Sequence, residues 1–345
     1  MKRAAMTRRW FGLLFLALGA IACEEKESDG GAAPAGSGAA AKALSIAVIP
    51  KGTTHEFWKS VHAGAVKASR ELGVKIIWKG PLKEDDLKSQ VDLVQSFTAQ
   101  GVAGIALAPL NDRALVSSVK GAARAHIPVV VFDSDLQGDA HASFVATDNR
   151  AAGRLAGEAM AKALDGKGNV VVLRYQEGSA STQNREAGFL EAVKQHPGIK
   201  VVSDNQYGGA TTESAFSASE NLLLAQSAAK GAVDGIFCPN ESTTFGMLLA
   251  LQKAGLKDKP VFIGFDSSDK LVEGLKKGDL HGLVLQDPFT MGYLAVKTLT
   301  EHLQGKKVPA RLDTGSRLIT PDNMNEPDSK RLLTPDLDKW LGKGT

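Results

Sequence analysis

One short loop near the start of the chain gathers several side chains that can contact a small polar molecule. It carries an amine, two hydroxyls, an imidazole and two aromatic rings, on Lys51, Thr53, Thr54, His55, Phe57 and Trp58. Amines, imidazoles and hydroxyls exchange hydrogen bonds, whereas aromatic faces cover apolar C–H groups. The combination therefore suits a small polyhydroxylated molecule. A simpler interpretation is that the two rings only attach a helix to a sheet, as buried aromatics often do.

The segments on either side of this loop predict how it is positioned. Residues 46–49 form an apolar run that is too short for a helix core and is stopped by Pro50 and Gly52, which predicts a central parallel strand. After the loop, the spacing of apolar residues predicts a helix that packs on a sheet, with a stripe formed by Phe57, Val61, Ala65, Ala68 and Leu72. Trp58 falls outside that stripe. We therefore expect it near the helix N-terminus, at the carboxyl end of the strand, where open α/β sheets bind ligands.

Strand-like runs alternate with amphipathic segments along the rest of the chain. The predicted strands are residues 44–49, 74–78, 104–108, 128–132, 143–146, 169–174, 199–203, 235–238, 260–265 and 282–286. A long helix is expected over residues 149–164, between the two halves of this series. Such alternation predicts parallel sheets covered by helices.

The second half of the series repeats the first. The run Gly104-Ile105 leading to Pro109 is matched by Gly235-Ile236 leading to Pro239. The strand that ends at Asp133 is likewise matched by the strand that ends at Asp266. A constant offset of about 130 residues predicts two copies of one α/β lobe, because shorter periods would indicate a solenoid. Two such lobes can place the carboxyl edges of their sheets across a cleft from each other.

The first 43 residues have a different character. Residues 1–23 show the layout of an export signal, with Arg8-Arg9, an apolar stretch over 10–20 and small residues before Cys23. The sequence AIAC at 20–23 resembles a bacterial lipobox, which implies that Cys23 is lipidated and becomes the N-terminus. Plain secretion is the alternative. Residues 24–43 are rich in Gly, Ala, Ser and Pro and are typical of a flexible tether.

Composition excludes several classes of protein. With 345 residues, 43% hydrophobic, the chain can form two cores of roughly 130 residues each. The 41 Lys and Arg nearly balance 38 Asp and Glu once the four basic residues before Cys23 are removed, so nothing indicates nucleic acid binding. Cys238, in an apolar run, is expected to be a small buried hydrophobe. No disulfide framework, metal site or cofactor is expected.

Seven motifs together resemble the periplasmic sugar-binding proteins of the ribose, galactose and allose type, which are the receptor subunits of ABC sugar importers. In chain order they are AVIPKGTTHEFW at 47–58, FDSD at 132–135, ATDN at 146–149, NREAGF at 184–189, Asn240 after Pro239, GFD at 264–266 and LQDP at 285–288. The resemblance extends from residue 44 to about residue 320.

This resemblance implies the type I periplasmic binding fold, an α/β fold of two Rossmann-like lobes joined by a three-segment hinge. Each lobe is then a parallel sheet flanked by helices. The crossings would fall near 146–149, 286–288 and 313–316. The first lobe would comprise residues 44–147 and 287–314, and the second lobe residues 148–286 together with 315–345. The tail over 328–340 is expected to pack on one lobe as a helix or an extended segment.

The resemblance also implies a ligand pocket shared by the two lobes. Its predicted residues are Lys51, His55, Phe57, Trp58, Asp133, Arg185, Asn240, Asp266 and Gln286. Phe57 and Trp58 match an aromatic pair that sandwiches a sugar ring, and the two aspartates match acceptors of sugar hydroxyls. Arg185 is expected just before a helix over 186–195, where a plain surface charge is the alternative.

The predicted function is an exported, membrane-tethered receptor that binds a monosaccharide or similar polyol and delivers it, as a monomer, to an ABC permease. Ser134 stands where ribose-type relatives often have arginine, which argues against ribose, whereas Lys51 and Trp58 favour a hexose-like ligand. A signalling receptor for chemotaxis is the alternative. A glycosidase with Asp133 and Asp266 as its carboxylate pair is disfavoured, because both end equivalent strands of repeated lobes.

Overall fold

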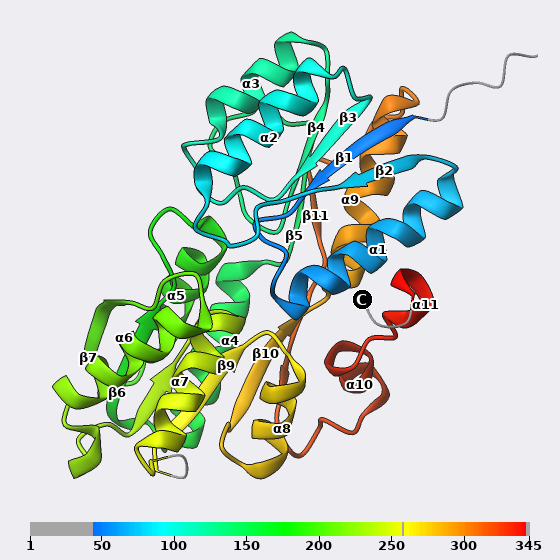
Figure 1. Ribbon diagram of the computed structural model, residues 1–345. Coiled ribbons are helices and arrows are strands. Elements are labelled where there is room, and N and C mark those ends of the chain that lie inside the picture. Colours follow the sequence, from blue (N-terminus) through cyan, green and yellow to red (C-terminus); the bar gives the residue numbers. More distant parts are fainter. Residues whose placement is uncertain (1–43, 257–258, 343–345) are drawn as a thin grey trace, which may run out of the picture. The chain divides into compact units, whose positions relative to one another are not determined.

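The computed structural model of this protein describes residues 44–256 and 259–342. The export signal, Cys23 and the tether predicted for residues 1–43 lie outside the described residues. The described chain forms two six-stranded sheets, each flanked by helices (Figure 1). The predicted fold class is confirmed.

The sheet of the first lobe has the strand order β11-β5-β4-β3-β1-β2, and all its pairs are parallel. Its strands are β1 (Ser45–Ile49), β2 (Lys75–Trp78), β3 (Gly104–Leu107), β4 (Val129–Phe132), β5 (Ser143–Ala146) and β11 (Arg311–Asp313). Helices α1 (Glu56–Leu72) and α9 (Pro288–Leu303) cover one face. Helices α2 (Leu87–Ala99) and α3 (Val116–Arg124) cover the other. Both faces of β1, β3, β4 and β5 are therefore buried, which is why these strands appear as continuous apolar runs.

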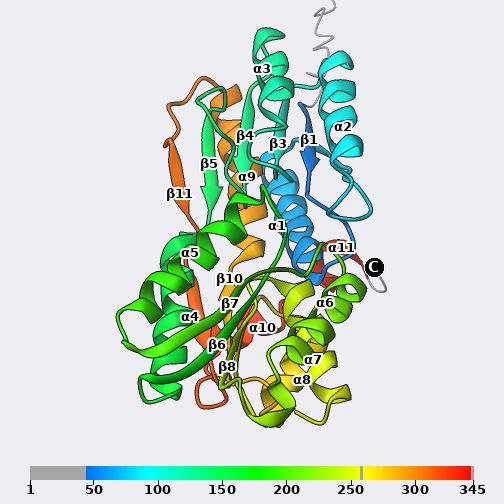
Figure 2. The ribbon, with the colours of Figure 1, turned by 90° about the vertical axis from the view of Figure 1, so that its left-hand side faces the viewer.

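The sheet of the second lobe has the order β12-β10-β9-β8-β6-β7. Its strands are β6 (Lys167–Arg174), β7 (Gly198–Tyr207), β8 (Gly235–Phe237), β9 (Val261–Phe265), β10 (Gly282–Gln286) and β12 (Ser316–Ile319). Helices α4 (Asn149–Ala163) and α5 (Ala180–Lys194) cover one face. The other face carries α6 (Thr212–Ala225), η1 (Ala228–Lys230), α7 (Glu241–Lys253) and α8 (Asp269–Lys277). Figure 2 shows α4 and α5 on one side of the second sheet and α7 and α8 on the other.

The two strand orders correspond position by position, which is the duplication that the repeated runs indicate. The strands β11 and β12 were not predicted. They are short and only partly buried, so they lack the apolar runs that reveal the other strands. The strand β12 also pairs antiparallel with β10, which makes the second sheet mixed.

Glycines bring one helix pair of each lobe into backbone contact. A Cβ atom at Gly64 would lie 1.9 Å from the Phe289 carbonyl oxygen, and one at Gly292 would lie 2.0 Å from the Val61 oxygen. The same reciprocal arrangement joins α4 to α5 through Gly153 and Gly188. Each lobe therefore has at least one helix interface with no room for a side chain, and in the first lobe this contact ties α1 firmly to α9.

The chain passes between the two sheets three times, after β5, after β10 and after β11. The crossings are bonded to one another. The Thr147 hydroxyl donates to the Gly315 carbonyl oxygen over 3.1 Å, and the Asp313 carboxylate accepts from the Asp148 amide over 3.1 Å. Gln286, at the second crossing, pairs with Ser316 at the third. The three segments therefore lie together and can act as a single hinge.

The C-terminal segment contacts both lobes, whereas the sequence predicted packing on one. Helix α10 (Pro327–Leu333) places Leu333 in the core of the second lobe. Helix α11 (Asp338–Leu341) lies beside α1, where Arg70 donates to the Trp340 carbonyl oxygen over 3.0 Å (Figure 1). Residues 327–341, called the tail below, therefore connect the lobes in addition to the three crossings.

Replacing Gly64 with alanine is expected to destabilise the protein by about 1–3 kcal/mol or more, because the new methyl group has no space against the α9 backbone. Urea unfolding measures this difference. Gly121→Ala, in α3, is the matched control: its Cβ would meet only the Arg124 side chain, at 3.9 Å. The control is expected to leave stability unchanged or to raise it by up to about 1 kcal/mol. Equal stability of the two variants would contradict the close packing of α1 on α9.

Candidate ligand-binding site

The two aspartates that end equivalent strands share one unusual backbone conformation. Asp133 follows β4 with φ 62°, and Asp266 follows β9 with φ 64°. Each donates its amide to the neighbouring strand, over 3.0 Å to Val145 in one lobe and 3.0 Å to Val284 in the other. Positive φ is uncommon outside glycine, and such residues cluster at functional sites. The duplicated geometry places both carboxylates in one cavity.

All nine side chains predicted from the sequence line this cavity, which we call the first cavity. Its described lining is Lys51, His55, Phe57, Trp58, Glu84, Asp133, Tyr175, Ser181, Thr182, Arg185, Asn240, Asp266 and Gln286. Glu84, Tyr175, Ser181 and Thr182 were not foreseen. They belong to loops and a helix start without a recognisable motif, so only the packing of the two lobes brings them here. The function of the nine residues in binding stays a prediction.

Lys51 connects the lobes at one side of the cavity. Its buried ammonium lies 2.8 Å from Asp133 Oδ2 and donates to Ser181 Oγ of the second lobe over 2.9 Å. A buried charge is costly unless it is paired and hydrogen-bonded. Lys51 meets that requirement with one partner from each lobe.

Glu84 is the centre of a second buried group. Its carboxylate accepts from Trp58 Nε1 and from the Tyr175 hydroxyl, each over 2.6 Å, and lies 2.6 Å from His55 Nδ1. Burial alone would lower the pKa of His55, but the Glu84 carboxylate outweighs it and raises that pKa to about 9. Burial alone would raise the pKa of Glu84, but His55 lowers it to about 2. His55 and Glu84 therefore form a charged pair.

Arg185 lies inside a helix, not before one. The sequence predicted a helix over 186–195, but α5 begins at Ala180, which puts Arg185 in its second turn. The preceding residues, Ala180 to Asn184, include weak helix formers, and packing of α5 on α4 overrides their propensity. The guanidinium is 2% exposed, so the surface interpretation is wrong.

The contacts of Arg185 explain how the second lobe holds a buried cation. It donates from Nε to Asn149 Oδ1 over 2.8 Å and from Nη1 to the Pro239 carbonyl oxygen over 2.9 Å. Its guanidinium also lies 4.1 Å from the centre of the Phe265 ring and 3.8 Å from Asp266 Oδ2. Burial raises the pKa of Asp266 although Arg185 opposes the shift.

Gln286 and Asn240 contribute two side-chain amides to the first cavity. Gln286 Nε2 donates to Asp266 Oδ1 over 2.7 Å, while its buried Oε1 has no hydrogen bond among the described residues. A buried acceptor without a partner is costly, so a hydroxyl donor in the cavity would be favoured. The side chain of Asn240 accepts from the Thr243 amide, which makes it the N-cap of α7 as well as a wall of the cavity.

Glu241, another residue that the sequence did not reveal, joins the lobes at the start of α1. Its two carboxylate oxygens accept from the Glu56 and Phe57 amides, each over 3.2 Å. His55 occupies the N-cap position of α1 without a side-chain bond to the helix, so a residue of the second lobe performs the capping. Burial raises the pKa of Glu241 to about 7, against the opposing effect of His55.

The first cavity is narrow. Its volume is about 20 Å³, which is room for little more than a water molecule. The lobes meet across it through Lys51 and Ser181, Glu84 and Tyr175, and Glu241 with the start of α1. A molecule of sugar size can enter only when the lobes move apart about the hinge.

No metal site is found at this cavity or elsewhere in residues 44–256 and 259–342, where no group of three His, Cys, Asp or Glu could hold an ion. Asp135 is exposed and does not line the cavity, so the sequence DSD forms no chelating pair. Cys238 is free and buried, as expected.

Comparison with known proteins defines the class. Residues 46–307 match the model of the periplasmic binding protein domain, so the chain belongs to the periplasmic binding protein family. This confirms the resemblance inferred from the motifs. Membership also supports a periplasmic location and a role as a binding component of transport, not as an enzyme.

Particular relatives give the comparison more detail. The ribose import binding protein RbsB of Haemophilus influenzae is 28% identical over 275 residues, which cover 80% of this chain and 91% of that protein. A carbohydrate transporter solute-binding protein from Agrobacterium radiobacter, solved with D-arabinose, is 35% identical with a TM-score of 0.81, covering 85% and 99% of the two chains. A solute-binding protein from Agrobacterium vitis with bound D-fucose is 36% identical with a TM-score of 0.80, covering 84% and 99%.

The charged pair of His55 and Glu84 predicts a pH dependence of stability. The raised pKa of His55 contributes stability that is fully present below its usual value of 6.5 and is lost as pH rises through about 9. The lowered pKa of Glu84 contributes stability that is present above 4.5 and is lost as pH falls towards about 2. His55→Gln should therefore lower the free energy of unfolding most, relative to wild type, between pH 4.5 and pH 6.5.

Urea unfolding from neutral pH to roughly pH 10 tests this, because the difference between wild type and His55→Gln should shrink over that range. His62→Gln is the matched control. Burial lowers the pKa of His62 to about 4, so it is neutral over the whole range and its difference from wild type should stay constant. A constant difference for His55→Gln would show that the imidazole is not charged in the folded protein.

Proposed function

We propose that this chain is an extracytoplasmic solute-binding protein that binds a monosaccharide or similar polyol in the first cavity and delivers it, as a monomer, to an ABC permease. The observation that carries the proposal is the convergence of charged and amide groups from both lobes on one cavity walled by Phe57 and Trp58. The relatives that were solved with D-arabinose and D-fucose support it.

The chemistry of the lining fits a sugar. A sugar has an apolar C–H face and a rim of hydroxyls that both donate and accept. Asp133 and Asp266 can accept from hydroxyls, Lys51 and Arg185 can donate to them, and Gln286 has a free acceptor. Hydrogen bonds to charged groups contribute about 1.5–3 kcal/mol each, so three or four of them give roughly micromolar affinity after ordering costs.

The aromatic rings of the first cavity also suit a sugar, although they do not form the sandwich that the sequence predicted. The rings of Phe57 and Trp58 lie 4.9 Å apart between centres and nearly perpendicular, at 88°, so they are not two parallel walls. Tyr175 of the second lobe adds a third ring to the cavity. We infer that a sugar ring packs against one of the first-lobe rings and contacts Tyr175 from the other lobe.

The lobe boundaries are part of the proposal. We assign residues 44–147 and 287–314 to the first lobe, and residues 148–286 and 315–345 to the second lobe together with the C-terminal tail. Residues 257–258 and 343–345 of this division lie outside the described residues. Strand pairing supports this division, since β11 pairs with β5 and β12 with β10. Because each lobe supplies about half of the hydrogen-bonding groups, a bound sugar would favour the closed form, and closure would present the permease with a distinct surface.

Asp266→Ala and Trp58→Ala should each weaken sugar binding at least tenfold, about 1.4 kcal/mol, by removing a hydroxyl acceptor and an apolar wall. Calorimetry with the tightest ligand of a panel of pentoses and hexoses measures the change. Asp135→Ala, two residues beyond Asp133 but exposed and outside the cavity, is the matched control and should bind like wild type. Unchanged affinity in folded Asp266→Ala and Trp58→Ala would remove the first cavity from the proposal.

We further propose that Cys23 is lipidated and that residues 24–43 hold the lobes near a bacterial membrane. No helix within 44–256 or 259–342 is long and apolar enough to cross one. Cys23→Ser should move the protein from the membrane fraction to the soluble fraction after cell lysis. Cys238→Ala, which changes the buried cysteine, should stay with the membrane. Wild-type protein in the soluble fraction would contradict lipidation.

A further inference from the structure

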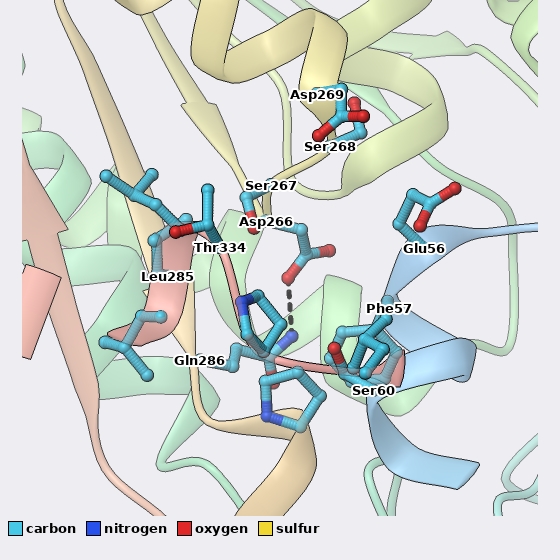
Figure 3. A pocket seen from close by; sticks show the side chains of 15 residues that line it. Glu56, Phe57, Ser60, Asp266, Ser267, Ser268, Asp269, Leu285, Gln286 and Thr334 are labelled. Carbon is cyan, nitrogen blue, oxygen red and sulfur yellow. Dashed lines mark hydrogen bonds between the residues drawn. The ribbon is translucent and has the colours of Figure 1, made fainter. Parts of the chain in front are cut away.

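A second and larger cavity adjoins the first. Its volume is about 160 Å³, against about 20 Å³ for the first. Phe57, Asp266 and Gln286 line both, so the two cavities share a wall (Figure 3). A single water molecule needs a cavity volume of roughly 10–15 Å³, measured in the same way, so the second cavity has room for a small ring.

Four parts of the molecule form the second cavity, and one of them is the end of β10 with the second crossing, which contributes Leu285, Gln286 and Pro288. Helix α1 contributes Glu56 and Ser60, and the segment between β9 and α8 contributes Ser267 and Ser268 (Figure 3). The tail supplies the remaining side, with residues 332–335 and Leu337. The cavity therefore lies where both lobes and the tail meet.

The tail is attached firmly on both sides of this cavity. At one end, Leu333 is buried in the second-lobe core, and Arg331 lies 2.7 Å from Asp287 at the second crossing. At the other end, Trp340 contacts Arg70 of α1 and lies 6.2 Å from the Phe289 ring. The wall that the tail provides is thus held by contacts to both lobes.

The lining indicates what the second cavity can bind. One part is apolar, with Phe57, Pro335 and the leucines Leu332 and Leu337, and another carries the hydroxyls of Ser60, Ser267, Ser268 and Thr334. Its charged groups are the carboxylates of Glu56, Asp266 and Asp269, and none of the described lining residues is Lys, Arg or His. A phosphate or carboxylate group would be repelled, whereas a neutral ring with one apolar face would be accommodated.

We propose that the second cavity is a subsite for the second unit of a neutral glycoside, either another sugar ring or a small aglycone. The inference rests on the proposed function, because the first cavity would hold the terminal sugar. The bond between the two units would pass the shared wall beside Gln286, whose free Oε1 can accept from a hydroxyl of either unit. The ligand class is then a disaccharide or glycoside in addition to a free monosaccharide.

Calorimetry with the purified protein tests this. The probes are D-ribose, D-arabinose, D-fucose, D-galactose and D-allose, together with the methyl and 4-nitrophenyl glycosides of each in both anomers. One anomer of a 4-nitrophenyl glycoside should bind at least tenfold tighter than its free sugar, and its methyl glycoside should show less of this gain.

Two variants test whether the additional affinity of the glycoside comes from the second cavity. Leu337→Trp fills the second cavity from the tail and Ser267→Leu fills it from the opposite wall, and neither residue lines the first cavity. Both should abolish the gain for the glycoside and leave the affinity for the free sugar unchanged. Asp338→Trp, which introduces the same ring on an exposed residue of the tail that lines neither cavity, should keep the gain.

The outcomes separate this inference from the proposed function. If free sugars bind but no glycoside binds tighter, the sugar-binding function stands and the second subsite is wrong. If a glycoside gains affinity and keeps the gain in both filling variants, its second unit binds elsewhere and the subsite is also wrong. If neither the sugars nor the glycosides bind, the proposed function and the subsite are both wrong.

Discussion

The buried charges between the lobes impose the main physical constraint on this structure. A charge removed from water is costly unless it is paired and hydrogen-bonded, and several charged side chains surround a cavity of about 20 Å³. The pairs Lys51 with Asp133 and His55 with Glu84 belong to the first lobe, and Arg185 with Asp266 belongs to the second. Glu241 has its partner in the amides that begin α1 across the cleft. Closing the lobes is thus possible because each charge has a partner in the closed form.

Under the proposed function, the same constraint would link the closed form to a ligand. Gln286 and Asp133 each keep one buried oxygen without a hydrogen bond among the described residues, although the Asp133 oxygen faces the Lys51 ammonium. A polyol bound in the first cavity, as proposed, would supply the missing donors, while the existing pairs would have to separate to admit it. The free energy gained from the new hydrogen bonds, less the free energy lost when the charge pairs separate, would set the affinity for the ligand. Because each lobe would move as a rigid body, ligand binding would change the position of one lobe relative to the other. The glycine contacts within each lobe keep that movement at the hinge, because they leave α1 and α5 no freedom against α9 and α4.

The tail adds a second connection between the lobes. It is attached to the core of the second lobe through Leu333 and to α1 of the first through Trp340. Any opening about the hinge must therefore shift α11 on α1 or bend the segment between the two tail helices. In this protein, the wall of the second cavity and the restraint on opening come from one segment, which couples the shape of that cavity to the position of the lobes.

The amino-acid sequence by itself determined the fold class and the main residues of the first cavity. Buried parallel strands are apolar along their whole length, and strand ends at matched offsets place Asp133 and Asp266 at equivalent edges. Local pattern failed where burial is partial or the environment comes from distant segments. Strands β11 and β12 are half exposed, and the start of α5 has weak helix formers that packing on α4 overrides. Glu84, Tyr175 and Glu241 carry no motif, because their roles arise only when the other lobe approaches. The tertiary structure alone decided which charges pair, since the partners of each pair lie far apart in the chain and no local stretch of sequence encodes the distance between them.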